Sequence, residues 1–236
     1  ANYTSDKTYI VNHTVGKDGV QVASILLGTG GLKKVVDKVD DGVEKVGKEI
    51  ISEVDDALVK QIDGADGVAK RELKKAKETG LIDTDVIESG VNELNDIATK
   101  KGNKLSWEEI QKFFKRGNDF NRKALTKYDF NEIVLENGKR LDSYIPGKEI
   151  ISRKATTLSN IKPETFNNYL QELITKYKKG TKINSSKTSG VLEGDYFLEI
   201  PTSNKSFFES SSEFQKVLND FNKNKSVNIK IKYLDE

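Results

Sequence analysis

Three polar residues, Asp142, Ser152 and Lys154, have the types and the spacing for chemistry on one face of a β-sheet. Side chains alternate between the two faces of a strand, so Ser152 and Lys154 share a face. Asp142 belongs to the preceding β-type run. It joins that face, opposite Ser152, if the connection between the runs has an odd number of residues. An acid, a small oxygen ligand and a lysine on one face suggest metal-dependent hydrolysis of a phosphodiester.

Two turn signals define the strands that would carry these residues. Asn137-Gly138 separates the β-type run 131–136 from the run 139–145, and it is the commonest two-residue hairpin sequence because both positions need positive φ. Pro146-Gly147 separates the second run from the third, 149–155, since proline presets φ and glycine supplies a positive value. The sequence therefore predicts a three-stranded meander.

Composition removes several classes of enzyme. The chain has no Cys, which excludes disulfides, thiolate metal sites and cysteine nucleophiles. Its one histidine, His13, lies in a polar, Gly-containing leader, which argues against catalytic triads and zinc proteases. The absence of Met and the start at Ala1 indicate a piece excised from a longer protein.

Charge is distributed unevenly along the 236 residues. Residues 101–236 hold 25 Lys and Arg against 18 Asp and Glu, a net charge of +7, whereas residues 1–100 hold 14 against 19, a net charge of −5. Nearly all aromatic residues also follow residue 100. We therefore expect two domains, 1–103 and 104–236, of which the second has the electrostatics to bind a polyanion such as nucleic acid.

The first domain is expected to be mainly helical. Residues 1–31 are interpreted as a loose leader whose apolar patch, 20–27, is too short to span a membrane and which ends in a glycine hinge. Apolar residues spaced by three and four over 32–62 predict an amphipathic packing helix, and a similar pattern predicts a helix over 85–99.

The second domain is expected to alternate helices and strands. Ser106 and Glu109 form a capping box that begins a helix interrupted at Gly117. After the meander come a helix over 163–179, a strand over 196–200, a helix over 208–222 and a strand over 227–233. The order is thus α, three strands, α, β, α, β, and alternation predicts that Glu199 faces outward.

This order resembles the PD-(D/E)XK nuclease fold, known from restriction endonucleases. The segments GNDFN, YDFNEIVLENGKRLDSYIPGKEIISRKAT and GDYFLEIP resemble C-terminal nuclease toxin domains of bacterial polymorphic toxins, including contact-dependent inhibition and LXG-type effectors. The resemblance covers residues 104–236. It implies an α/β domain of restriction-endonuclease-like αβββαβαβ order, preceded by a helical pre-toxin or delivery segment over 1–103.

The resemblance also implies roles for individual residues. Asp142 would be the metal ligand on the second strand, and Ser152-Arg153-Lys154 the third-strand element, with serine where the general pattern has Asp or Glu. Glu132 matches an acidic position on the first strand and would be a further ligand. The implied cofactor is a divalent metal ion, Mg²⁺, Mn²⁺ or Zn²⁺. Lys154 would orient the attacking water and neutralise developing charge.

The identity of the extra acid stays open. A two-residue hairpin would pair Ile133 with Asp142 and place Glu132 on the opposite face, in which case Glu109 or Asp119 from the preceding helix would supply the acid.

Three basic residues of the meander are candidates for contact with nucleic acid: Arg140, Lys148 and Arg153. The sheet face has no evident array of aromatic residues on which RNA bases could stack. Its dispersed basic residues suit contact with a nucleic-acid backbone, so DNA is favoured over RNA as the substrate.

The function expected from the resemblance is that of an antibacterial nuclease toxin, secreted or delivered at the cell surface and acting in the cytoplasm of the target cell. An acidic immunity protein would neutralise it, and stable membrane association of the nuclease domain is not expected. The alternatives are a tRNA-cleaving toxin of the same fold and a non-catalytic nucleic-acid-binding or adaptor module.

Overall fold

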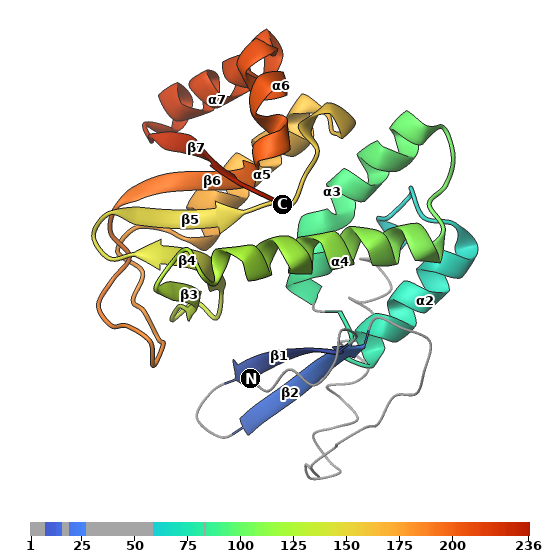
Figure 1. The fold of residues 1–236 in the computed structure, drawn as a ribbon, viewed down its shortest axis with the longest axis horizontal. Coiled ribbons are helices and arrows are strands. Elements are labelled where there is room, and N and C mark those ends of the chain that lie inside the picture. The colour runs from blue at the N-terminus through green and yellow to red at the C-terminus, as the bar shows by residue number, and fades with distance from the viewer. Residues whose placement is uncertain (1–7, 16–18, 27–58, 83) are drawn as a thin grey trace. The chain divides into compact units, whose positions relative to one another are not determined.

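The computed structural model describes residues 8–15, 19–26, 59–82 and 84–236, and its contacts divide the chain into two compact units (Figure 1). The first unit comprises residues 1–112 and the second residues 113–236. The glycine hinge and most of the helix expected over 32–62 lie outside the described residues.

The first unit contains a β-hairpin and helices. Strands β1 (Thr8–Val15) and β2 (Gly19–Leu26) pair antiparallel, with Thr8 opposite Leu26. The interpretation of residues 1–31 as a loose leader is therefore wrong for this part, which is rich in the β-branched residues that favour strands. Helices α2 (Gly67–Glu78) and α3 (Thr84–Lys101) follow. None of the helices in the described ranges is both long and apolar enough to cross a membrane.

Helix α4 (Trp107–Ala124) begins at the predicted capping box. The Glu109 carboxylate accepts the Ser106 N–H at 2.9 Å, and the Ser106 hydroxyl accepts the Glu109 N–H at 3.4 Å. The helix is continuous through Gly117, where the sequence predicted an interruption. A glycine inside a helix costs only about 1 kcal/mol relative to alanine, which the surrounding helix tolerates.

The second unit is built on a five-stranded mixed sheet, which confirms the expected mixed α/β class (Figure 1). Its strands are β3 (Phe130–Val134), β4 (Arg140–Ile145), β5 (Glu149–Arg153), β6 (Asp195–Pro201) and β7 (Ile229–Leu234). They lie side by side in chain order. The first three form the predicted antiparallel meander, and β6 and β7 add in parallel through helical crossovers.

Helices cover both faces of this sheet. Helix α5 (Pro163–Lys176) and helix α7 (Ser212–Lys225) pack over one face, where Phe166 and Leu170 are fully buried against strand residues such as Leu198. The end of α4 covers the other face, where Ala124 and Tyr128 pack on Ile151.

The helix expected over 208–222 is two helices, α6 (Lys205–Ser210) and α7. Ser211 separates them, because its extended backbone ends α6 and its hydroxyl caps α7 by accepting the Phe214 N–H at 3.4 Å.

Gly138 is the residue on which the β3–β4 turn depends. Its φ is +76°, a conformation that strains any residue with a Cβ. We expect Gly138→Ala to lower the free energy of unfolding by about 1 kcal/mol. Gly117→Ala in helix α4 is the matched control: its new methyl meets no atom within 4 Å, and it should raise stability by up to about 1 kcal/mol. Urea denaturation of both variants would measure the difference, and equal signs would contradict the turn geometry.

Candidate active site

The β3–β4 connection determines where Glu132 lies. The Leu135 N–H donates to the Lys139 carbonyl at 2.9 Å, which leaves three residues, Glu136 to Gly138, in the turn instead of the expected two. Gly138 occupies the left-handed position of such a three-residue loop. Adding one residue to the turn moves every side chain of the strand to the other face relative to its partner.

The longer turn places Glu132 opposite Asp142, because Asn131 pairs with Ser143 and Ile133 with Leu141. The expectation that Glu132 lies on the opposite face is therefore wrong. Glu132 itself has a φ of +55°, which is rare for a residue with a side chain and strained by about 1 kcal/mol or more.

The β4–β5 connection has an odd number of residues, which was the condition for Asp142 to share a face with Ser152. Ile145 pairs with Glu149 and Ser143 with Ile151, so three residues form the turn. Continuing this register by one residue places Asp142 opposite Ser152. A carboxylate oxygen of Asp142 accepts the backbone N–H of Arg153 at 2.8 Å, which ties the two strands together at this point.

Lys154 follows β5 and extends its pairing, since its N–H donates to the Glu199 carbonyl at 3.0 Å. Its ammonium group contacts a carboxylate oxygen of Glu172 on α5 at 2.8 Å and lies 5.2 Å from the centre of the Tyr169 ring. Glu172 also pairs with Lys176 at 2.7 Å. Glu172 therefore fixes the position of the candidate catalytic lysine.

Sequence reasoning missed Glu172. One signal was available, because Glu172 lies one turn after the inward-facing Tyr169 and next to Leu173 in the helical pattern.

Arg140 and Tyr177 complete the surroundings of the two carboxylates. The Arg140 guanidinium contacts Glu132 at 2.5 Å, and the Tyr177 hydroxyl donates to the Arg140 carbonyl at 2.9 Å. Burial, and then the nearby charges of Asp142, Glu172 and Glu132, hold the pKa of Tyr177 well above its usual value. Tyr177 therefore stays a neutral hydrogen-bond donor beside the acids.

The pKa values of Asp142 and Glu132 are both raised above their usual values. Burial is the main cause for each, and the negative charge of Asp142 adds to the effect on Glu132. Arg140 and Arg153 lower both pKa values but do not compensate fully. Glu132 keeps 32% of its side chain exposed, so its carboxylate is accessible from solvent. A bound cation would relieve the unfavourable charge.

The donor set fits a hard cation. Two carboxylates and the Ser152 hydroxyl offer only oxygen, which suits Mg²⁺ or Mn²⁺ better than Zn²⁺. Among residues 59–82 and 84–236 no group of three or more Asp, Glu, His or Cys side chains is arranged to hold a metal. Mg²⁺ commonly takes one or two carboxylates and completes its shell with water and substrate phosphate, so a pair of acids is compatible with it.

The alternative acids have other roles. Glu109 closes the α4 capping box and pairs with Lys101; the hydrogen bond from Lys101 is the main reason that its pKa falls to about 2. Asp119 forms ion pairs with Lys115 and Arg122 along α4. Of the three candidates, only Glu132 faces Asp142 across a strand pair.

Arg153 does not lie where a nucleic acid could reach it, which corrects its expected role. Its guanidinium is 1% exposed and pairs with Glu199 at 2.8 Å on the opposite face of the sheet. Glu199, expected to face outward, is instead fully buried. Burial alone would raise the pKa of Glu199, but the Arg153 charge and the hydrogen bonds from Lys127, Tyr128 and Arg153 outweigh it and hold the pKa below its usual value.

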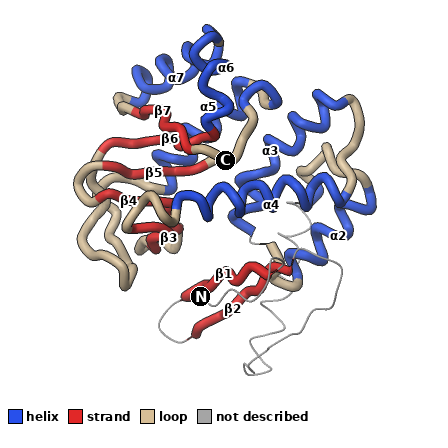
Figure 2. The backbone as a smooth tube through the Cα atoms, viewed as in Figure 1, coloured by secondary structure: helices blue, strands red, loops and turns tan. Residues whose placement is uncertain are grey.

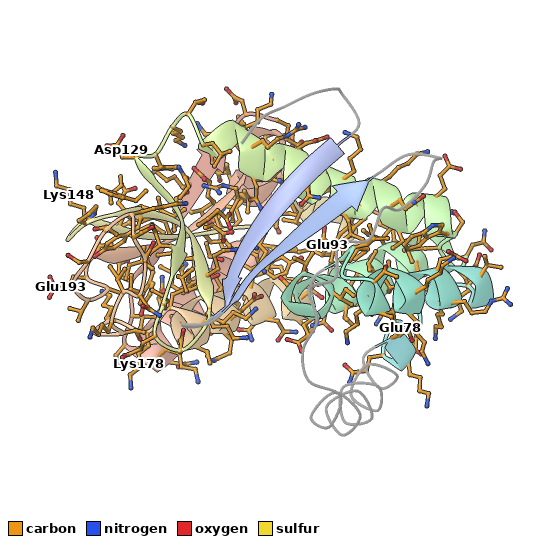
Figure 3. All side chains as sticks on the ribbon, turned by 90° about the horizontal axis from the view of Figure 1, so that it is seen from below. Glu78, Glu93, Asp129, Lys148, Lys178 and Glu193 are labelled. Carbon is orange, nitrogen blue, oxygen red and sulfur yellow. The ribbon has the colours of Figure 1, made fainter. Side chains whose placement is uncertain are left out.

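The other two basic candidates differ in location. Arg140 lies beside Glu132 at the acidic pair. Lys148 lies in the exposed β4–β5 turn and extends away from the sheet (Figure 3). Three strand residues at about 3.4 Å each separate Asp142 from the start of that turn, so Lys148 can contact only a ligand that is about 10 Å long or more.

Comparisons with family models, with curated proteins and with solved structures found no match for this chain.

Removing the Asp142 charge should stabilise the chain. The folded state binds a proton at Asp142 more tightly than the unfolded chain does, so the wild type loses stability as pH rises from the ordinary pKa of 3.8 through the raised one. Asp142→Asn lacks this loss and retains an oxygen for the Arg153 N–H. In EDTA, its advantage in free energy of unfolding should grow from pH 4 to pH 7.

The control for this measurement is Asp220→Asn on α7, where an exposed carboxylate pairs with Lys216. Its effect should stay below about 0.5 kcal/mol at every pH. An Asp142→Asn variant less stable than the wild type at pH 7 would show that the Asp142 carboxylate has a stabilising, structural role instead.

Proposed function

We propose that the second unit is a metal-dependent nuclease of the restriction-endonuclease-like type, hydrolysing phosphodiester bonds with DNA as the preferred substrate. The observation that carries this proposal is the position of Glu132 beside Asp142 on one face of the meander, with Lys154 following the next strand. The likeness of residues 104–236 to nuclease toxin domains supports the same chemistry.

Each side chain of the site would have its own role. Glu132, Asp142 and the Ser152 hydroxyl would hold the metal ion, which when bound supplies Lewis acidity and lowers the pKa of a water molecule. Lys154 would contact the scissile phosphate and stabilise its developing charge. Glu172 holds Lys154 in place, because the two side chains form an ion pair at 2.8 Å.

Arg140 adds positive charge next to the acids and would exchange its contact with Glu132 for one with a phosphate. Two loops carry exposed lysines, the β4–β5 turn and the connection between α5 and β6 (Figure 2). Their lysines, including Lys148 and Lys178 (Figure 3), would contact the polymer backbone. Contacts of this kind carry affinity without sequence preference.

One observation favours a second candidate, a binding module without catalysis. Lys154 and Arg140 already pair with Glu172 and Glu132, so both cations of the cluster belong to ion pairs within the protein. Such ion pairs can serve folding alone. The two candidates differ in whether Asp142 and Lys154 can be replaced without loss of function.

The deciding experiment uses the full chain with supercoiled plasmid DNA and with total tRNA, each with Mg²⁺, Mn²⁺ or EDTA. We expect plasmid cleavage that requires metal and weakens as salt rises. Asp142→Asn and Lys154→Met should lower the rate by roughly 100-fold or more, because each removes charge that acts in the transition state. Asp220→Asn, with a carboxylate far along α7, should cleave like the wild type.

Each other outcome has a definite reading. Fragmented tRNA together with intact plasmid would show that the substrate is tRNA and not DNA. Cleavage in EDTA would overturn the role of the metal. Binding without cleavage, unchanged in Asp142→Asn, would favour the binding module.

The enzyme would be a delivered antibacterial toxin that acts in the target cytoplasm, and its producer would encode an acidic immunity protein that covers the face carrying Glu132 and Asp142. Because residues 101–236 have a net charge of +7, association should be electrostatically steered. The association rate constant should therefore fall by roughly tenfold or more between low and 0.5 M salt. A basic inhibitor with salt-independent association would contradict this.

A further inference from the structure

The residues that follow or precede the site residues along the chain point to the opposite face of the sheet. Asn131 precedes Glu132, Ser143 follows Asp142, and Arg153 follows Ser152. All three are buried there, with exposed fractions of 7%, 0% and 6%. Each strand of the meander thus carries a site residue on one face and a buried polar residue directly behind it.

Hydrogen bonds join these three residues into one chain across the strands. A terminal nitrogen of Arg153 donates to the Ser143 hydroxyl at 2.8 Å, and the Ser143 hydroxyl donates to the Asn131 side-chain oxygen at 2.6 Å. The Asn131 amide nitrogen donates to the Tyr128 carbonyl at 2.5 Å. The chain therefore links β5 to β4, β4 to β3, and β3 to the segment after α4.

Glu199 on β6 anchors this chain. Its fully buried carboxylate accepts from the Arg153 Nε at 2.8 Å, from the Tyr128 hydroxyl at 2.6 Å and from Lys127 at 2.7 Å. Buried charges of this kind need every partner, because a carboxylate left unpaired in the interior is strongly unfavourable. The arrangement of four strands and the end of α4 is thereby fixed at this point.

The network reaches the other face at two places, the Arg153 N–H and the backbone next to Glu132. Arg153 has its side chain held by Glu199 and Ser143, and its N–H donates to the Asp142 carboxylate. The side chain of Asn131 is hydrogen-bonded to Ser143 and Tyr128. Asn131 therefore holds the backbone directly before Glu132, which is the residue with the left-handed conformation. Both acids are thus fixed by side chains that never touch their face of the sheet.

We propose that Asn131, Ser143, Arg153 and Glu199 form a positioning network for the candidate active site, with Glu199 acting on Asp142 through Arg153. The inference rests on the proposed function for its catalytic meaning. Its structural content, that the network sets the Asp142 to Arg153 hydrogen bond, stands independently of catalysis. Positioning matters because small displacements of a catalytic group lower the rate strongly.

The test is Ser143→Ala in the full chain, which removes the middle link and leaves the Arg153 to Glu199 ion pair. Hydrogen exchange followed by NMR reports the Arg153 amide directly, and we expect it to exchange roughly tenfold faster relative to the Ile151 amide. In the nuclease assay, kcat should fall by roughly tenfold or more while KM stays within about twofold.

Asn204→Ala is the matched control. Asn204 is a buried polar residue of the same unit, 2% exposed, whose side chain bonds to Leu158 and Thr156 and not to the network. It should lower stability without changing the Arg153 amide or kcat. If Ser143→Ala does not fold, Tyr128→Phe removes one hydrogen bond to Glu199 and should give the same two changes.

The two readouts separate the two proposals. Unchanged exchange at Arg153 in a folded Ser143→Ala variant would overturn the positioning network whatever the activity. Faster exchange at Arg153 in a chain whose wild type cleaves neither polymer would retain the network and overturn the proposed function. Faster exchange with unchanged kcat would show that the network is structural only and overturn its catalytic role.

Discussion

The register of the β3–β4–β5 meander is the constraint on which the rest of the second unit depends. Side chains alternate with a period of two, so a slip of one residue would exchange the site residues with the buried polar residues behind them. Glu132 and Asp142 would then move to the face covered by the end of α4, and Asn131 and Ser143 to the face covered by α5. Two three-residue turns and the buried hydrogen-bond chain together exclude that slip.

Carboxylates on the two faces of this meander have pKa values shifted in opposite directions. Behind the sheet, Arg153, Lys127 and Tyr128 surround Glu199, so its charged form is favoured in spite of complete burial. In front, two carboxylates lie together with fewer cationic contacts, and their charged forms are disfavoured. Groups with strongly perturbed pKa values of this kind often cluster at functional sites.

Much of this architecture could be predicted from the sequence, because its signals are local. Helical periodicity in α5, turn residues around the meander and the Ser106–Glu109 capping box depend only on neighbouring residues. The pairing of Asp142 with Ser152 was expected on the condition that the β4–β5 turn is odd in length, and the structure meets this condition. These features needed no knowledge of distant contacts.

The errors have equally physical reasons. Asn-Gly is compatible with turns of two and of three residues, and that single-residue difference decided the face on which Glu132 lies. Strand alternation predicted that Glu199 faces outward. This was wrong because the partners that allow its burial, residues 127, 128 and 153, are far away in sequence. Nothing within β6 itself reveals them. Glu172 was missed because a single acid among inward-facing helix positions looks like a boundary residue.

Glu132 shows how stability and function compete at this site. Its left-handed backbone is strained by about 1 kcal/mol or more. Its carboxylate also lies beside that of Asp142, so backbone strain and charge repulsion both oppose folding. Glycine at this position would remove both. Strain of this kind persists only where surrounding structure enforces it, and here the enforcing contacts are the Asn131 hydrogen bonds on one side and the Arg140 ion pair on the other. The residue with the least favourable local conformation in the meander is thus the one that completes the acidic pair, which is the arrangement expected if the pair was selected for binding a cation.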